Sequence, residues 1–171
     1  MKTVTTVGFT FAAMAVLALA AGGGKMKITT SAFQEGGTIP EKFSKNGQNI
    51  SPELRIDGVP AEAKSLALIV DDPDAPVGLF THWLVWNIDP KTTEIAERTA
   101  PSGAVQGKSD FGEIGYGGPQ PPSGTHRYYF KVFALDRMLD LKPGAKRPEV
   151  DAGMKGHVLA QGQLMGRYSR K

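Results

Sequence analysis

The stretch from residue 65 to residue 76 reads Ser65-Leu66-Ala67-Leu68-Ile69-Val70-Asp71-Asp72-Pro73-Asp74-Ala75-Pro76. Its first half is almost wholly apolar, with little alternation between polar and apolar residues. Such a run predicts a central strand that is buried on both faces. Its second half combines three acids with two prolines, which restrict the path of the backbone. The predicted strand therefore ends in a stiff, negatively charged segment.

Two further segments have the same strand-like character, residues 82–88 and 127–135. Turn signals recur roughly every ten to fifteen residues, which favours short strands over long helices. One helix is predicted near the C-terminus, where Pro148 suits a first turn, Lys155-Gly156 an end, and Val150 and Met154 a shared core-facing stripe. Residues 158–168 then form a last strand. The predicted fold is mostly β, with two packed antiparallel sheets and short peripheral helices, including this one.

Composition excludes several classes of protein. The chain has 171 residues, 40% of them hydrophobic and 22% charged, as expected for one ordinary globular domain. It contains no cysteine, so thiolate zinc sites, iron–sulfur clusters, disulfides and thiol nucleophiles are excluded. The formal net charge is only +3, and there is no run of five basic residues. Nucleic acid is therefore not expected as a partner.

The N-terminal segment has the pattern of a secretory signal peptide. Lys2 precedes an uncharged stretch whose apolar core, residues 9–20, ends in small residues. We expect residues 1–20 to be removed near Ala20–Ala21, residues 21–25 to be a flexible spacer and residues 26–171 to be the domain. This predicts a periplasmic or secreted protein. Two alternatives stay open: an uncleaved signal anchor, and a cytoplasmic form that starts at Met26.

Polar chemistry is concentrated in two places. The first is the acid and proline segment 71–76, which imposes a particular backbone path at some electrostatic cost. The alternative interpretation is a plain acidic surface loop. The second is residues 115–122, rich in glycine and proline, which lead to His126 and Tyr128 on one face of the next strand. The alternatives are an exposed histidine at a strand end and a core tyrosine.

The two places are connected by the histidines. His82 and His126 each begin a predicted strand beside a loop of special backbone. If those strand ends converge, Asp72 would orient one imidazole, while glycine amides and the Tyr128 hydroxyl would supply donors. The product would be a small anion pocket that binds more tightly as the histidines become protonated, until the ligand itself takes up a proton.

At this point the residues resemble a known family. The motifs are Asp72-Pro73-Asp74-Ala75-Pro76, His82-Trp83, Gly117-Gly118-Pro119 and His126-Arg127-Tyr128-Tyr129-Phe130, with Asn49-Ile50-Ser51-Pro52 before them and Gly156-His157-Val158-Leu159-Ala160 after them. In this order they resemble the phosphatidylethanolamine-binding protein family, and most closely its bacterial, Raf-kinase-inhibitor-like branch of the YbhB/YbcL type. The resemblance covers nearly all of residues 26–168.

The resemblance implies two antiparallel sheets with flanking helices and a small pocket for phosphate, phosphoryl head groups or similar anions. Residues implied to line that pocket are Asp72, His82, Gly118, Pro119, His126 and Tyr128. Asp74 and Trp83 are implied to support it, through loop geometry and packing. Lys45 and Gln120 stand where family members commonly carry cysteines, which removes any thiol-linked behaviour. No metal or cofactor is implied, and a homodimer is compatible with the bacterial relatives.

Two classes of function follow. The first is a non-catalytic binding protein that holds a phosphate-like ligand and regulates a protein partner in the manner of the family's kinase or protease inhibitors; the sequence does not identify that partner. The alternative is an enzyme that uses the same pocket. Asp72, His82 and His126 would then form a metal site of two histidines and one carboxylate, or a histidine would act as the base in a hydrolysis. No serine lies in a nucleophile-elbow sequence.

Overall fold

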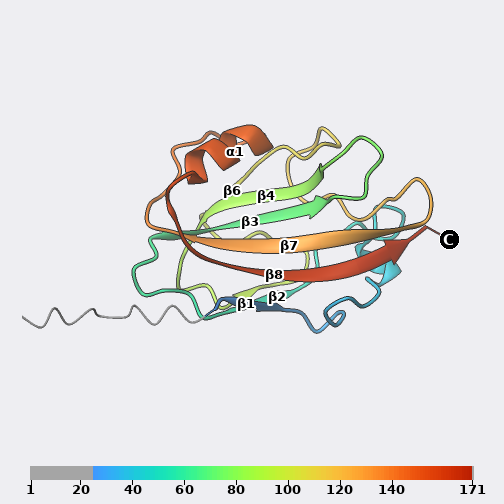
Figure 1. Cartoon of the computed structure of the whole chain (residues 1–171), viewed down its shortest axis with the longest axis horizontal. Coiled ribbons are helices and arrows are strands. Elements are labelled where there is room, and N and C mark those ends of the chain that lie inside the picture. Colours follow the sequence, from blue (N-terminus) through green and yellow to red (C-terminus); the bar gives the residue numbers. More distant parts are fainter. Residues whose placement is uncertain (1–24, 171) are drawn as a thin grey trace, which may run out of the picture.

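The computed structural model describes residues 25–170 (Figure 1). The predicted signal peptide, residues 1–20, and residues 21–24 of the predicted spacer lie outside the described residues. Between Lys25 and Arg170, no helix has the length and apolar character needed to cross a membrane.

The larger of two sheets has five strands in the order β6-β4-β3-β7-β8, and every neighbouring pair is antiparallel. Its strands are β3 (Ser65–Asp72), β4 (Phe80–Ile88), β6 (Val105–Gln106), β7 (Thr125–Leu135) and β8 (Val158–Ser169). β3 lies at the centre, and all eight of its residues are buried. The strands predicted from the apolar runs, and the final strand, are confirmed.

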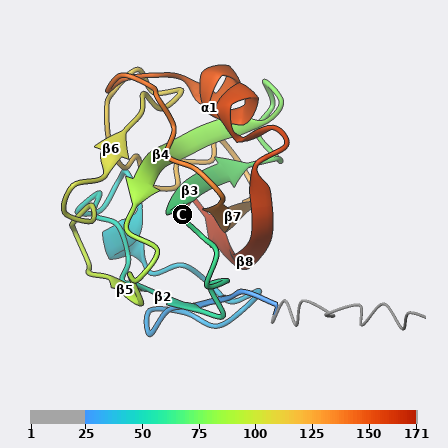
Figure 2. The same ribbon diagram turned by 90° about the vertical axis from the view of Figure 1, so that its left-hand side faces the viewer.

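The smaller sheet packs against one face of the larger one (Figure 2). It has the order β1-β2-β5 and contains β1 (Lys27–Thr29), β2 (Leu54–Asp57) and β5 (Glu94–Ile95). A 3-10 helix, η1 (Glu41–Phe43), adds Phe43 to the apolar core between the sheets. Members of this core include Ile28, Leu54 and Ile56 from the small sheet and Leu68, Phe130 and Leu164 from the large sheet. Two packed antiparallel sheets are therefore confirmed.

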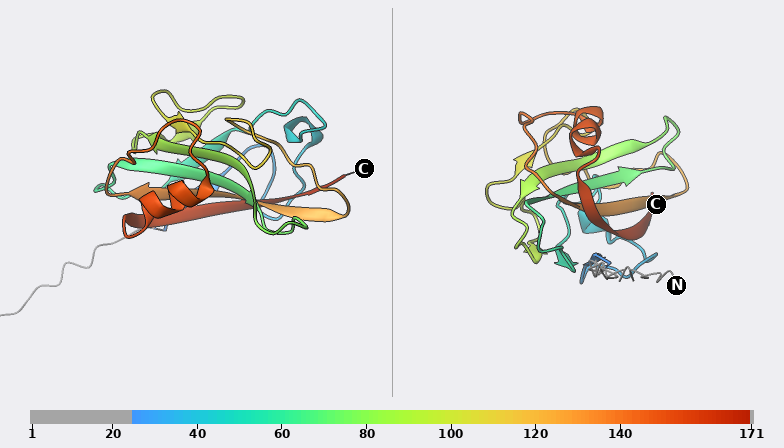
Figure 3. Two further views of the ribbon diagram at one scale, coloured as in Figure 1. Left: turned by 90° about the horizontal axis from the view of Figure 1, so that it is seen from above. Right: turned by 60° about the vertical axis from the view of Figure 1, so that its left-hand side comes forward.

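One α-helix, α1 (Arg147–Met154), covers the opposite face of the large sheet (Figure 3, left). Pro148 occupies its first turn, and the Glu149 carboxylate accepts a hydrogen bond from the Lys146 N–H at 2.8 Å, which satisfies a donor at the helix start. Val150 and Met154 are buried, as the four-residue spacing predicts. They complete a second apolar core with Ala67, Ile69, Leu84 and Trp86.

Two glycines have opposite roles in this packing. At Gly166, in β8, an added Cβ would lie 2.6 Å from Ile39 and 2.7 Å from Phe33, both buried. At Gly153, in α1, the nearest atom would be Leu139 Cδ2 at 3.4 Å, an ordinary van der Waals contact. The absence of a side chain is therefore a packing requirement at Gly166 but not at Gly153.

The same substitution should change stability in opposite directions at these two sites. Gly166→Ala overpacks the inter-sheet core and should lower the free energy of unfolding by about 1–3 kcal/mol. Gly153→Ala removes a glycine from the last turn of α1 and should raise the free energy of unfolding, by up to about 1 kcal/mol. Urea unfolding followed by circular dichroism measures both. A Gly166→Ala variant as stable as the parent chain would contradict the packing described here.

Candidate functional site

Three of the predicted site residues come together where β3 ends, at the right-hand end of the large sheet in Figure 1. Asp72 is the last residue of β3, His82 lies in β4 and His126 is the second residue of β7. All three line one cavity of about 140 Å³. The remaining lining residues are Ala75, Pro76, Val77, Phe80, Phe111, Gln120 and Pro122. The cavity thus combines two imidazoles and one carboxylate with mostly apolar walls.

The Asp72 carboxylate has both oxygens engaged. Oδ1 accepts the backbone N–H of Asp74 at 2.8 Å, and Oδ2 accepts Nδ1–H of His126 at 2.7 Å. Both side chains are nearly completely buried. Because an ionised carboxylate can only accept, Nδ1 of His126 must carry a proton. The other ring nitrogen, Nε2, is left for a ligand.

His82 is held in the same way by a different acceptor. Its Nδ1–H donates to the backbone carbonyl of Gly117 at 2.7 Å, so its Nε2 is also the nitrogen that remains. The rings of Phe80, Phe111 and Tyr128 surround it, with centroid distances of 5.1, 5.3 and 5.1 Å. Burial lowers the pKa of His82, although the Gly117 carbonyl and the Asp72 charge oppose this shift. His82 is therefore neutral at pH 7 in the empty cavity.

The proline-containing loop is fastened to β7 by a second acid. Asp74 accepts two hydrogen bonds from the Arg127 guanidinium, at 2.8 and 2.6 Å, and a third from the Arg127 backbone N–H at 2.9 Å. The guanidinium lowers the pKa of Asp74 to about 2. The pair keeps its charges at all ordinary pH values, so residues 72–76 stay anchored beside His126.

Tyr128 and Trp83 are fully buried and neither lines the cavity, although the family resemblance implied that Tyr128 would. The Trp83 Nε1–H donates to Gln106 Oε1 at 2.9 Å, and its ring meets Tyr116 edge to face. The Tyr128 hydroxyl makes no hydrogen bond within the part of the chain that the structure describes. Burial and the neighbouring Asp72 charge raise its pKa well above the usual value, so it keeps its proton.

The sequence predicted that amides of the glycine-proline loop, residues 115–122, would donate to an anion. In the structure, two of these amides are instead bonded within the protein. The Gly117 N–H donates to the His82 carbonyl at 2.9 Å, and the Gly118 N–H donates to Asn49 Oδ1 at 2.8 Å. Pro119 has no N–H, and its carbonyl accepts the Lys45 N–H at 3.0 Å. None of these three residues lines the cavity. Their backbones are occupied in fixing His82 and the adjoining loop, so the expectation of free amides is wrong for them.

Several wall residues were missed by sequence reasoning. Phe80 lies two residues before His82 in β4, so strand alternation places both on one face and could have identified it. Phe111 carries no such signal, because a loop brings it to the cavity. Asn49 has a positive φ of 54°, a conformation that asparagine tolerates, and its side chain anchors Gly118. Pattern analysis of strands does not reveal such a loop contact.

The arrangement does not match a metal centre. Among residues 25–170, no three His, Asp or Glu side chains are grouped so that they could hold one metal ion. The physical reason is that the Asp72 carboxylate is directed at Nδ1 of His126 and at the Asp74 amide, not at a shared point with both histidines. The alternative of two histidines and one carboxylate as metal ligands is therefore not supported.

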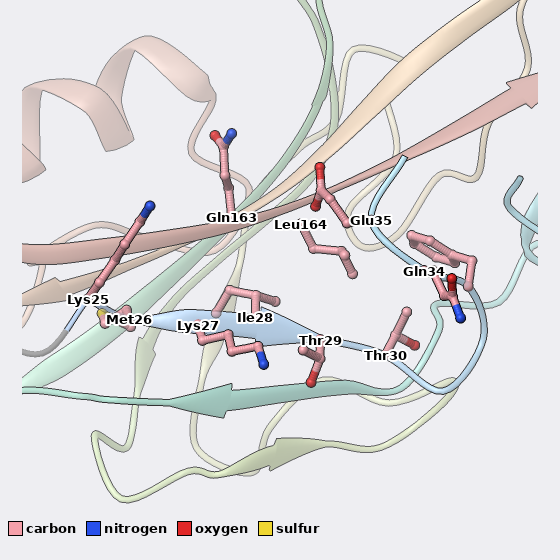
Figure 4. A pocket seen from close by; sticks show the side chains of 11 residues that line it. Lys25, Met26, Lys27, Ile28, Thr29, Thr30, Gln34, Glu35, Gln163 and Leu164 are labelled. Carbon is pink, nitrogen blue, oxygen red and sulfur yellow. The ribbon is translucent and has the colours of Figure 1, made fainter. Parts of the chain in front are cut away.

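A larger hollow, of about 680 Å³, lies between β1 and β8 (Figure 4). Its walls mix lysine, threonine and glutamine with apolar residues such as Ile28 and Leu164, and no histidine lines it. The smaller cavity at Asp72 is therefore the stronger candidate site, because two imidazole groups line it.

The chain is similar to known proteins over most of its length. The family model described as "Phosphatidylethanolamine-binding protein" matches residues 29–169. A UPF0098 protein of Methanothermobacter thermautotrophicus is 51% identical over 150 residues, which cover 85% of this chain and 99% of that protein. A UPF0098 protein of Pyrococcus horikoshii is 49% identical over 162 residues, covering 88% of this chain and 81% of that protein.

Solved structures show the same similarity. A phosphatidylethanolamine-binding protein homologue from Chlamydia trachomatis superposes with a TM-score of 0.82 at 44% identity, covering 86% of this chain and 99% of that one. E. coli YbcL, described as a member of the mammalian family, superposes with a TM-score of 0.82 at 31% identity, covering 86% of this chain and 100% of that one. Sequence, fold and the arrangement of the motif residues lead to one conclusion: the chain belongs to the phosphatidylethanolamine-binding protein family.

Proposed function

We propose that the chain is a binding protein whose cavity at Asp72, His82 and His126 holds a small anionic group, a phosphate or a phosphoryl head group. The observation that carries the proposal is that two imidazoles line one cavity with their Nδ1 atoms already hydrogen-bonded. Nδ1 of His126 donates to the Asp72 carboxylate, and Nδ1 of His82 donates to the Gly117 carbonyl. Each ring then has only Nε2 to offer. A protonated Nε2 donates a charge-assisted hydrogen bond, which an oxyanion accepts.

The size of the cavity supports a head group over a complete ligand. Its 140 Å³ is below the roughly 300–1,000 Å³ typical of sites that enclose a whole small molecule. Pro76, Val77 and Phe80 form part of its wall, and the Val77 side chain is 82% exposed. The remainder of a ligand would therefore extend outward past apolar side chains, while its charged group contacts the histidines.

The lining also favours binding over hydrolysis. Among the residues that form the cavity, none carries a hydroxyl or thiol. A covalent mechanism of the serine or cysteine type therefore lacks a nucleophile at the imidazoles. His82 is neutral in the empty site, so its Nε2 is an acceptor there. Binding of an anion then requires the uptake of a proton.

Removal of an imidazole should weaken anion binding selectively. His126→Ala should reduce the affinity for phosphoethanolamine roughly 10- to 100-fold, because a hydrogen bond to a charged group contributes about 1.5–3 kcal/mol. His157→Ala is the matched control, since His157 lies outside the cavity and contacts Asp136. Isothermal titration calorimetry of the three proteins provides the measurement. Equal affinities for the parent chain and His126→Ala would overturn the proposed site.

Binding should also become stronger as pH falls. Sulfate is the suitable probe, because its charge stays constant between pH 8 and pH 5. The pKa of His82 lies below 6.5 in the empty site, and a bound anion favours the protonated ring, so the affinity should rise through this range. Calorimetry in buffers of different ionisation enthalpy should show proton uptake, and His82→Gln should reduce it. Binding that is independent of pH and buffer would contradict a role for His82.

Acid should lower the stability of the empty protein, although it raises the affinity for an anion. Because the pKa of His82 is lowered by folding, the unfolded chain binds the proton first as pH falls below about 6.5. The contribution of His82 to the free energy of unfolding should therefore decrease between pH 7 and pH 5. Urea unfolding of the parent chain and His82→Gln at both pH values measures it. If both proteins lose stability equally between pH 7 and pH 5, protonation of His82 is not the cause of that loss.

A further inference from the structure

A second polar hollow lies on the face of the large sheet that carries α1. It has a volume of about 460 Å³ and is lined by Lys25, Lys131, Phe133, Arg147, Gln161, Gly162 and Gln163. Three of these seven residues are cationic, two carry side-chain amides and none is acidic. The hollow shares no residue with the cavity at His82 and His126. This cationic hollow is therefore not part of the cavity at His82 and His126.

Two of the cations are fixed from below by a buried carboxylate. Asp71 is completely buried, with the Lys131 ammonium 3.0 Å from Oδ1 and the Arg147 guanidinium donating to Oδ2 at 3.0 Å. Arg147 also donates to Asp151 through Nε at 2.8 Å. Asp71 does not line the hollow. The carboxylate therefore positions both cations, and both line the hollow.

Strand register brings the amides to the same place. Lys131 pairs with Gln163, and Phe133 pairs with Gln161, across β7 and β8. Because directly paired residues share a face, all four side chains lie on the α1 side of the sheet. In Figure 4, the Lys25 ammonium and the Gln163 amide both point toward that side. Donors from β7, β8, α1 and Lys25, two residues before β1, thus line the hollow.

We propose that this hollow is a second anion site, which binds the tetrahedral oxyanion group, phosphate or sulfate, of a small molecule. Ammonium, guanidinium and amide groups are all donors, and a tetrahedral oxyanion presents several acceptor oxygens in different directions. A planar carboxylate has only two oxygens and would leave donors from one side unused. The volume lies within the range of sites for small molecules, and Phe133 supplies an apolar surface beside the charged group.

The site can be tested by a titration with inorganic phosphate followed by two-dimensional amide NMR of the full chain. Sodium chloride at matched ionic strength serves as the blank. Phosphate should shift the amides of Lys131, Gln161 and Gln163 along a saturable curve. In His126→Ala those shifts should persist unchanged, which separates this site from the cavity at His126. Shifts that do not saturate, or that the chloride blank reproduces, would overturn the proposal.

A pair of variants distinguishes phosphate binding at a specific site from attraction by the overall charge of the protein. Lys25→Glu should weaken the binding measured at Gln163 at least fivefold, whereas Lys64→Glu should leave it unchanged. Lys64 is exposed and lines neither this hollow nor the cavity at His126, so it matches the change in charge. Gln163→Glu, which leaves the contacts of Asp71 intact, should weaken binding similarly. Equal weakening by Lys25→Glu and Lys64→Glu would reduce the effect to overall charge and refute the site.

Discussion

The candidate cavity depends on the buried Asp72 carboxylate. A charge removed from water is tolerated only when its oxygens are fully bonded, and Asp72 meets this condition with the Asp74 amide and His126 Nδ1. The first bond turns the chain immediately after β3, and the second sets the tautomer and direction of the His126 ring. Arg127 then holds Asp74 in place. One carboxylate therefore determines both the wall of the cavity and the nitrogen that faces a ligand.

The same strand end explains how three acids are accommodated within four residues. Alternation along β3 sends Asp71 to the α1 face and Asp72 to the opposite face. Asp71 is paired with Lys131 and Arg147, Asp72 with His126, and Asp74 with Arg127. Asp71 and Asp74 each lie beside a cation, and Asp72 accepts hydrogen bonds from His126 and from the Asp74 amide, so each carboxylate is stabilised separately despite the short spacing. The central strand thereby supports a polar cluster on each side of the sheet.

Much of this arrangement could be predicted from the sequence, because the apolar run of residues 65–70 and the aromatic-rich run of residues 127–135 leave a strong pattern. The strands of the small sheet have only three, four and two residues, too short for a readable period. The convergence of Asp72, His82 and His126 followed from their places at strand ends. The role of the glycine loop could not be predicted in this way. The Asn49 side chain, which accepts a hydrogen bond from the Gly118 amide, lies 69 positions earlier in the sequence.

The aromatic wall gives the cavity its chemical character. Phe80, Phe111 and Tyr128 exclude water from His82, and the resulting desolvation outweighs the neighbouring carboxylate, so the empty site favours a neutral ring. An oxyanion about 4 Å from the ring would contribute roughly 4 kcal/mol to the charged form at an effective dielectric constant of about 20. That energy corresponds to about three pKa units. Apolar packing around the imidazole therefore makes proton uptake part of anion binding, and to a greater extent than at an exposed histidine.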